Sequence, residues 1–426
     1  MSPEELRDAV VAQLPDAPIV VALGGGADSA VGAWVCAGQQ QVRAVFVHHG
    51  LAGSASLQAA AGEVAEALGI PLTVLSAPLA EGGNLEARAR DARWRAIGED
   101  LGDGEIVATG HSQDDVAETL LINMLRGAGS RGLAAMSADR TDIIRPLSAV
   151  TRSDLRSFAE ELGLPFVDDP ANDDPAYLRN RIRADLIPLL EAGYEPGVRA
   201  TLARAGSLLA ADDAVLEAAA RRVPVRDDGD ALLIPAAVLT TLPAAVASRA
   251  VRRALRIIHP PYAGTAADVD TVLSIAVGAE TAATLSGAVS VAREGPHVAV
   301  WAGEAAMPDP VALSVPGSAT FGAHLISARP VEAGGPRPFS TVLVDPAVFE
   351  AGVIVRAAGV GERIDIAEGT KLVRDALGEA GVPVRRRAAW PVLANDAKIA
   401  AIVGGRVAPW ARPTGADAAS VTQEYA

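Results

Sequence analysis

The sequence predicts an α/β protein whose first part is built on a parallel sheet. Four short apolar segments, at residues 19–23, 41–49, 72–75 and 105–108, alternate with helical segments along the chain. Such alternation is typical of strands joined by crossover helices, which cover both faces of a parallel sheet. The first segment is continuously apolar, as expected for a strand that is buried on both faces.

The remaining elements follow in order. Helices are expected at 4–14, 30–37, 56–69, 84–100, 113–126 and 151–162, and a last short strand at 143–150. The pattern is helical and rich in Ala, Leu and Arg at 198–256, a small helix and strands follow at 264–301, and two prolines mark a linker at 303–310. Short strands are expected at 311–345, and a mixture of helix and strand at 350–412.

Composition limits the function classes. The 426 residues are enough for two or three domains, and the net charge of −15 argues against a protein that coats nucleic acid non-specifically. A single cysteine, Cys36, excludes an intramolecular disulfide and a Cys-rich zinc site. The acidic N-terminus is unlike a secretory signal, and no run of about 18 apolar residues predicts a membrane span. We therefore expect a cytoplasmic protein with no membrane partner.

The first strand runs into a glycine loop, Gly24-Gly25-Gly26-Ala27, which is followed by Asp28, Ser29 and a helix. Strand, glycine loop and helix together present backbone N–H groups to a phosphate at a positive helix end. Ser29 is then placed to contact a phosphate, and Asp28 to contact Mg²⁺ or a backbone N–H. The alternative is a tight turn capped by Asp28, and the glycines alone do not decide between the two. The loop matches neither the dinucleotide fingerprint nor the lysine-containing P-loop.

Polar groups follow three of the predicted strands, at 24–29, 48–50 and 110–115. Ligands bind beyond the carboxyl ends of the strands in such sheets, so these segments are expected to converge on one site. In the third, Ser112 and Asp115 have the spacing of a capping box, which taken alone favours helix capping over catalysis. In the helix that follows, Leu121, Met124 and Leu125 are expected to pack inward.

A basic stretch at 177–183 follows an acidic, turn-rich loop at 168–174. Arginines at this density can pair with phosphates, or form salt bridges to the acidic loop just before them. The sequence leaves both interpretations open.

Taken together, these motifs resemble the tRNA(Ile)-lysidine synthetases, which belong to the PP-loop, or N-type ATP pyrophosphatase, group. The resemblance covers nearly the full length, and seven motifs in the right order make it specific. They are the glycine loop with Asp28-Ser29, His49-Gly50-Leu51, Glu86-Ala87-Arg88 through Arg93-Trp94, Gly110-His111-Ser112-Gln113-Asp114-Asp115 through Glu118-Thr119, Leu125-Arg126-Gly127, Arg145-Pro146-Leu147, and Arg179-Asn180-Arg181-Ile182-Arg183. Near the C-terminus, Gly361-Glu362-Arg363, Lys371 and Trp390-Pro391 resemble the small domain that grips the tRNA acceptor end.

The resemblance implies a PP-loop catalytic domain of the adenine nucleotide alpha hydrolase-like fold at 1–197. It implies a mainly helical middle tRNA-binding domain at 198–307 and a small α+β tRNA-binding domain at 311–415. The implied reaction uses ATP and Mg²⁺ to adenylate the wobble cytidine of a tRNA(Ile) with a CAU anticodon, after which free L-lysine displaces AMP and leaves lysidine. A homodimer is compatible with the resemblance.

The resemblance also implies roles for individual residues. The catalytic residues are Asp28, His111, Asp114, Asp115 and Arg145, and Asp114 and Asp115 are the candidates for holding Mg²⁺. ATP is expected at Gly24, Gly25, Gly26, Ala27, Asp28 and Ser29. Substrate binding is expected at Glu118, Arg126, Arg179, Asn180, Arg181, Arg183, Arg385, Arg386 and Arg387. Because the chain is acidic overall, the positive surface for tRNA must be local, around 179–183 and 385–387.

Three positions depart from the family pattern: Gly24 replaces a serine, Ala52 replaces a common arginine, and Ser112 replaces a common second histidine. These changes keep a degenerate, non-catalytic PP-loop tRNA-binding protein open as an alternative. A PP-loop tRNA thiolase is the rival enzyme, but such enzymes use cysteine pairs or an iron–sulfur cluster, and this chain has one cysteine. An amidotransferase-like synthetase would bring a glutaminase domain or an N-terminal cysteine, and neither is present.

Overall fold

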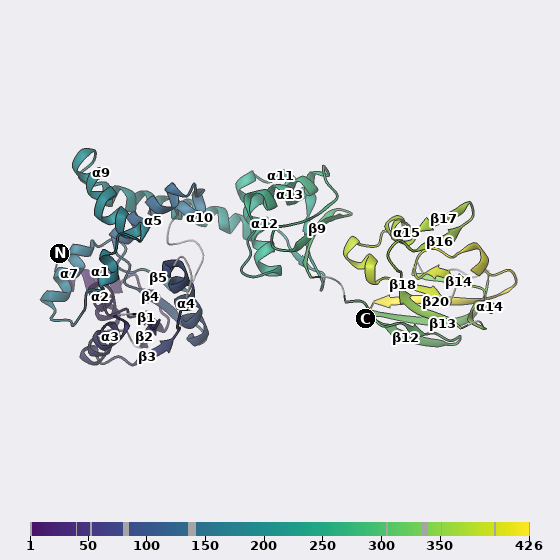
Figure 1. Ribbon diagram of the computed structural model, residues 1–426, viewed down its shortest axis with the longest axis horizontal. Coiled ribbons are helices and arrows are strands. Elements are labelled where there is room, and N and C mark those ends of the chain that lie inside the picture. The colour runs from purple at the N-terminus through teal and green to yellow at the C-terminus, as the bar shows by residue number, and fades with distance from the viewer. Residues whose placement is uncertain are drawn as a thin grey trace. The chain divides into compact units, whose positions relative to one another are not determined.

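The computed structural model describes residues 2–39, 41–51, 53–79, 85–134, 142–303, 306–333, 340–350, 352–395 and 398–425. Residue 52, one of the three departures, and residue 84, where a helix was expected to begin, lie outside these ranges. The chain divides into two compact units, Met1–Leu216 and Glu217–Ala426. In Figure 1 the first unit is purple to teal and the second is green to yellow.

The first unit is built on a five-stranded sheet in the order β3-β2-β1-β4-β5. The strands are β1 (Ile19–Ala22), β2 (Val42–His48), β3 (Leu72–Ser76), β4 (Ile106–Thr109) and β5 (Ile143–Ile144). All four strand pairs are parallel, with Ile19 opposite Val42 on one side and Ile106 on the other. The predicted parallel α/β architecture is confirmed.

Helices cover both faces of this sheet (Figure 1). Their bounds are α1 (Pro3–Val11), α2 (Ala27–Cys36), α3 (Ser54–Leu68), α4 (Leu85–Asp100), α5 (Gln113–Leu125), α6 (Ser130–Leu133), α7 (Arg152–Glu161), α8 (Leu178–Arg181), a π-helical turn (Ile182–Leu186), α9 (Ile187–Gly193) and α10 (Val198–Arg221). Successive residues of β1 face opposite sides: Ile19 and Val21 pack with α1, α2, α3 and α7, whereas Val20 packs with Ile97 of α4. This alternation explains why the strand is apolar throughout.

The prediction for the end of α5 was partly wrong. Leu121 is buried, but Met124 and Leu125 are 55% and 65% exposed. Leu121 packs in a cluster with Ile182 and Ile187, and the last turn of α5 extends beyond the residues that form this cluster.

The second unit begins with helices and an antiparallel sheet. The sheet has the order β6-β7-β10-β9-β8. Strands were expected after the small helix of 264–301, where three of these five lie, whereas the other two lie in 198–256, which was expected to be helical. The elements are β6 (Arg226–Asp227), β7 (Leu232–Pro235), α11 (Ala236–Thr241), α12 (Ala244–Ile258), α13 (Ala266–Val277), β8 (Ala282–Thr284), β9 (Val289–Glu294) and β10 (His297–Ala302).

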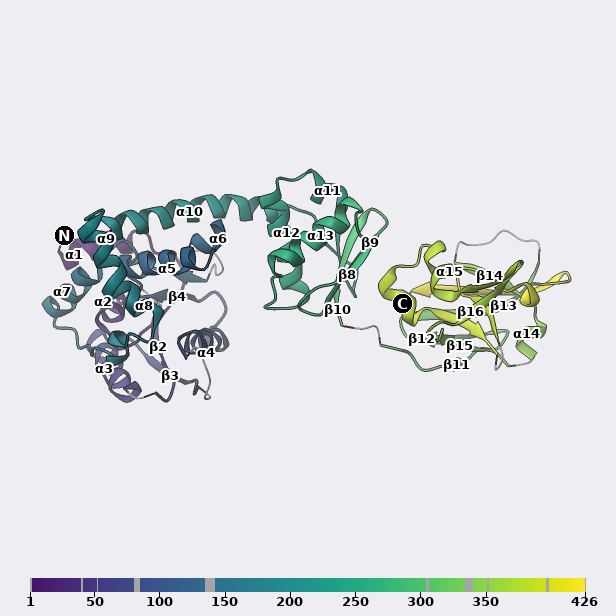
Figure 2. The same cartoon turned by 45° about the horizontal axis from the view of Figure 1, so that its top comes forward.

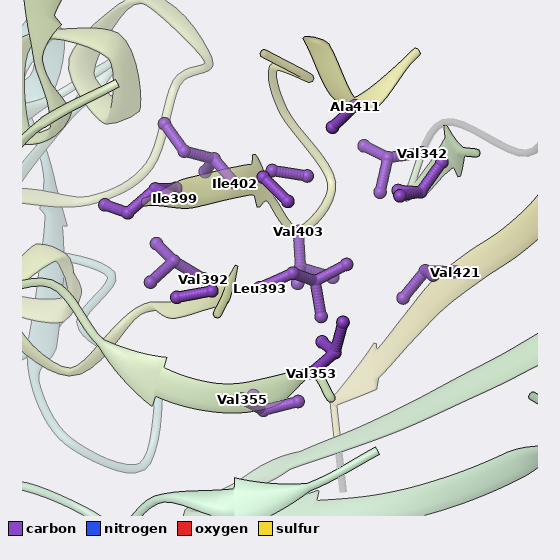
Figure 3. Close-up of a cluster of buried hydrophobic side chains, with 14 of the residues drawn as sticks. Val342, Val353, Val355, Val392, Leu393, Ile399, Ile402, Val403, Ala411 and Val421 are labelled. Atoms are coloured by element: carbon purple, nitrogen blue, oxygen red, sulfur yellow. The ribbon is translucent and has the colours of Figure 1, made fainter. Parts of the chain in front are cut away.

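The rest of the second unit is mostly strand, as predicted for 311–345. Two four-stranded sheets, β11-β15-β18-β19 and β12-β13-β20-β14, and a β16-β17 hairpin enclose a core of Val, Ile, Leu and Ala side chains (Figure 3). The elements are β11 (Val311–Ala312), β12 (Gly317–Phe321), β13 (His324–Glu332), β14 (Thr341–Val344), α14 (Ala347–Glu350), β15 (Ile354–Ala357), β16 (Arg363–Ile366), β17 (Gly369–Leu372), α15 (Val373–Glu379), β18 (Pro391–Ala394), β19 (Ile399–Ile402) and β20 (Asp417–Tyr425).

The division between the two units falls inside α10, which is one continuous helix (Figure 2). The boundaries predicted at 197 and 307 stay predictions. No helix in the described ranges is both long and apolar enough to cross a bilayer.

Candidate active site

The glycine loop is held in shape by its own serine. The backbone N–H of Gly24 donates to Ser29 Oγ at 3.1 Å, and Ser29 Oγ donates to the Gly26 carbonyl at 2.8 Å. Gly25 has a φ of 84°, and a Cβ at this position would lie 2.3 Å from the Leu57 carbonyl oxygen. Gly25 is therefore required both by its backbone conformation and by the close approach of α3.

The loop leads into the N-terminus of α2 without a side-chain cap. Gly26 is the N-cap residue, and α2 has no side-chain cap hydrogen bond, so the structure does not form the turn capped by Asp28. The first N–H groups of a helix need partners from outside it, and they attract anions. The arrangement is therefore suited to a phosphate group.

The end of β4 lies directly against this loop. A Cβ at Gly110 would be 2.6 Å from the Asp28 carbonyl oxygen, so glycine is needed there for the two segments to meet. The next residue, His111, has its Nδ1 at 2.6 Å from Thr109 Oγ1. Loss of water around the ring lowers the pKa of His111 to about 4, which leaves a neutral imidazole near pH 7.

The capping box predicted at the start of α5 is present. Ser112 Oγ accepts from the Asp115 N–H at 3.4 Å, and Asp115 Oδ2 accepts from the Ser112 N–H at 2.9 Å. The second oxygen of Asp115 accepts from Arg152 at 2.7 Å. Burial opposes the ionised form of Asp115, but the charge of Arg152 and the backbone hydrogen bond from Ser112 help to hold its pKa at about 2. Asp115 thus caps α5 and belongs to the site at the same time.

Arg152, at the start of α7, is a residue of this site that the sequence analysis did not identify. Besides its bond to Asp115, its Nε lies 3.4 Å from Asp28 Oδ2, and its Nη1 lies 3.7 Å from Glu118 Oε1. Burial raises the pKa of Asp28 to about 6, and the guanidinium of Arg152 opposes that rise. One signal was available, because Arg152 closely follows the Arg145-Pro146-Leu147 motif.

Asp114 is paired on both oxygens. One accepts from the backbone N–H of Arg152 at 2.8 Å, and the other accepts from the guanidinium of Arg199, which also binds Glu191 at 2.9 Å. Arg199 lies in the first turn of α10 and was also missed. No local pattern marks it, since it is 85 residues from Asp114.

The basic stretch pairs with a partner that neither interpretation of the sequence had considered. Arg183 Nε and Nη2 donate to the fully buried Glu118 at 2.7 and 3.1 Å, and Arg179 Nε lies 3.8 Å from the same carboxylate. Both arginines therefore contact α5. The amide of Asn180 holds that loop through the carbonyls of residues 171 and 174, and Arg181 donates to those of residues 175 and 176.

Two predicted residues sit near the other strand ends. Arg145 follows β5, where burial and the charge of Arg90 lower its pKa to about 10. Its Nε is buried and has no hydrogen-bond partner among the described residues. His49 follows β2, with Nδ1 at 3.0 Å from the Ala77 carbonyl oxygen, and burial lowers its pKa.

The remaining predicted substrate residues have other surroundings within their own units. Arg126 is exposed at the C-cap of α5. In the second unit, Arg385 is buried and pairs with Asp228, Asp230 and Glu294. Arg386 pairs with Asp228 and Asp230 at 2.9 Å each, and Arg387 donates to the Val382 carbonyl at 2.9 Å. A role for these three arginines in tRNA binding stays a prediction, and it would require some of these bonds to open.

The arrangement does not present a ready magnesium site at the predicted position. All four carboxylate oxygens of Asp114 and Asp115 accept hydrogen bonds from the protein. In the part of the chain that the structure describes, no group of three or more His, Cys, Asp or Glu side chains is arranged to hold a metal ion. Mg²⁺ at Asp114 and Asp115 stays a prediction.

Comparison with known proteins is consistent with this site. The family model described as "PP-loop domain" matches residues 4–190, and the one described as "TilS substrate C-terminal domain" matches residues 353–420. The tRNA(Ile)-lysidine synthase of Pseudomonas aeruginosa is 40% identical over 211 residues, which cover 47% of this chain and 48% of that protein. This chain thus spans about half the length of that relative.

Other relatives are covered more fully. The tRNA(Ile)-lysidine synthase of Nocardia farcinica is 40% identical over 239 residues, or 55% of this chain and 74% of that protein. That of Rhodococcus erythropolis is 38% identical over 256 residues, or 58% of this chain and 78% of that protein. With this identity across most of two relatives and a PP-loop domain that contains the glycine loop and the acidic residues of α5, the chain belongs to the tRNA(Ile)-lysidine synthase family.

Proposed function

We propose that this protein joins lysine to the wobble cytidine of a tRNA(Ile) that carries a CAU anticodon. The carbonyl oxygen at position 2 of the cytidine attacks the α-phosphorus of ATP, and pyrophosphate leaves. The ε-amine of lysine then attacks carbon 2 of the adenylated base, the carbon–oxygen bond to AMP breaks, and the amine loses a proton. The products are lysidine, AMP and pyrophosphate.

The observation that carries this proposal is the junction of two features at one end of the sheet. An uncapped helix start with a glycine loop, suited to phosphate, meets a helix whose first turns carry three carboxylates. A close backbone contact at Gly110 fixes their separation. In this proposal, an ATP site and a site for a cationic amine would be adjacent.

Individual roles follow from the contacts. The N–H groups at the start of α2 would hold the phosphates of ATP. The carboxylates of Asp115 and Glu118 would attract the lysine ammonium, in competition with the arginines that they already contact. Arg145, a half-buried cation whose buried Nε has no hydrogen-bond partner in the described ranges, is suited to stabilise negative charge on the adenylated intermediate. When bound, Mg²⁺ would offset the charge of the leaving pyrophosphate, and the residues that would hold it are not assigned.

The first test is incorporation of radiolabelled lysine into a transcript of tRNA(Ile) with the CAU anticodon, in the presence of ATP and Mg²⁺. A tRNA(Met) transcript with the same anticodon is the matched control, because it tests whether the protein also recognises parts of the tRNA outside the anticodon. We expect label in the first tRNA only.

Labelling of neither tRNA by the folded protein would reject the proposal in favour of a non-catalytic tRNA-binding relative. Gly24→Ser, which restores the usual family residue, would then show whether this departure is responsible. Labelling of both tRNAs would keep the chemistry and reject the stated specificity.

A further inference from the structure

Arg152 joins the glycine-loop side of the site to the α5 side. Its guanidinium donates to Asp115 of α5 at 2.7 Å and lies 3.4 Å from Asp28, which follows the glycine loop. Its backbone N–H donates to Asp114 at 2.8 Å. A guanidinium holds its donors in a rigid plane, so one arginine can contact oxygens that approach from different directions, which a lysine ammonium does less well.

The dependence on Arg152 differs between the carboxylates. Glu118 would keep its two hydrogen bonds to Arg183 if Arg152 were absent. Asp28 has no other cation within 4.0 Å among the described residues, and Asp115 would keep only Arg179, at 4.0 Å. Removal of Arg152 would therefore leave Asp28 without a nearby cation and free Oδ1 of Asp115, whose Oδ2 would keep its capping-box hydrogen bonds to Ser112.

The charges explain why such a bridge is needed. The carboxylates of Asp114 and Asp115 both act on Asp28 as like charges and raise its pKa. Partly buried like charges repel each other or take up a proton unless a cation lies between them. Arg152 lies in that place, because its nitrogens face Asp28 and Asp115 together.

We propose that Arg152 is a positioning residue that holds the carboxylates of Asp28 and Asp115 in fixed positions relative to each other. The groups that take part in adenylation of the base and in attack by lysine would then keep the same relative positions in both steps. This inference rests on the proposed function, in which ATP binds at the loop beside Asp28 and lysine binds beside Asp115. It assigns to Arg152 a contribution to both half-reactions without contact to either reacting atom.

The test measures the two half-reactions separately in the full chain. Release of pyrophosphate with ATP and tRNA but no lysine reports adenylation, and the rate at which added lysine displaces AMP reports transfer. The variants are Arg152→Gln and Arg152→Lys. The matched control is Arg156→Gln, one turn along α7, where the arginine pairs with Asp168 and Glu160 at the surface.

We expect Arg152→Gln to slow both half-reactions, each by about 100-fold, the cost of small displacements of reacting groups. Arg152→Lys should recover part of both rates, because it restores the charge but not the planar donors. Arg156→Gln should stay within about twofold of the wild type, as expected when an exposed ion pair is removed. A role in folding alone would lower the thermal unfolding midpoint and leave the rates of the folded fraction unchanged.

Loss of only one half-reaction, or of neither, in a folded Arg152→Gln protein overturns the inference. If Arg152→Gln fails to fold, Arg152→Lys is measured in its place under the same criterion. A wild-type protein that does not label tRNA rejects the proposed function and, with it, this role. A labelled wild type with an equally active Arg152→Gln rejects only the inference.

Discussion

His111 resists protonation in the folded protein, and this links stability to pH. Its pKa is about 4 in the folded chain, whereas the ordinary value is 6.5, so the unfolded chain binds the proton more readily between these values. The stabilisation is fully present above pH 6.5 and is lost as the pH falls towards 4.

We therefore expect the wild type to lose about 2 kcal/mol more unfolding free energy than His111→Gln between pH 7 and pH 5. Urea unfolding of both proteins at the two pH values measures this difference. Equal losses would show that His111 titrates normally in the folded state.

Residues of the site differ in how far sequence alone could assign them. Ser112 and Asp115 were recognisable as a capping box because they are three positions apart, and Asp115 forms this cap while its other oxygen binds Arg152. Arg152 was not recognisable in this way, since it lies 37 residues from Asp115 and a single arginine at a helix start is usually solvated. Contacts over such separations depend on the packing of α5 and α7, which no local pattern records.

At the scale of elements, the glycine loop contains two adjacent glycines, of which one can accept a side chain and the other cannot. Gly25 has a φ of 84°, and a Cβ added there would lie 2.3 Å from the backbone oxygen of Leu57. A Cβ added at Gly24 would have Ser29 Oγ, a side-chain atom, as its nearest neighbour, at 3.9 Å. There is therefore room for the serine that the family usually has at position 24, whereas any side chain at position 25 would clash with α3.

We expect Gly25→Ala to destabilise the protein by about 1–3 kcal/mol and to abolish ATP binding, because the loop must move away from α3. Gly24→Ala should change stability by no more than about 0.5 kcal/mol. Chemical unfolding and ATP titration of the two variants test this pair. Normal ATP binding by Gly25→Ala would mean that the loop adapts without losing its phosphate contacts.

The strands and helices around this loop were largely predictable, because apolar runs and glycines mark them locally. The five strands of the middle segment were only partly anticipated. Strands were expected at 264–301, but 198–256 was expected to be helical, and there β6 is only two residues long and exposed. Strands of that length carry no alternation that could be recognised.

At the scale of the molecule, the first unit needs the start of α10. Val198 and Leu202 pack against the cluster that contains Leu121, Ala203 packs against Val116, and Arg199 pairs with Asp114. A catalytic domain that ended at residue 197 would lose all of these contacts.

We expect a fragment of residues 1–216 to be more stable than a fragment of residues 1–197, by about 2–4 kcal/mol for the apolar surface alone. Thermal and urea unfolding of the two fragments make the comparison. Equal stability would show that the first turns of α10 contribute nothing to the first unit, and would favour the shorter boundary.

The pairing of Arg179 and Arg183 with Glu118 also affects how salt would act on RNA binding. A phosphate usually gains affinity at an arginine by sending mobile counterions into solution, and this makes binding steeply dependent on salt. At these two arginines an incoming phosphate would displace a carboxylate that belongs to the protein, so fewer ions are released. If RNA phosphates bind at these two arginines, their affinity would therefore depend on competition with Glu118 more than on ionic strength.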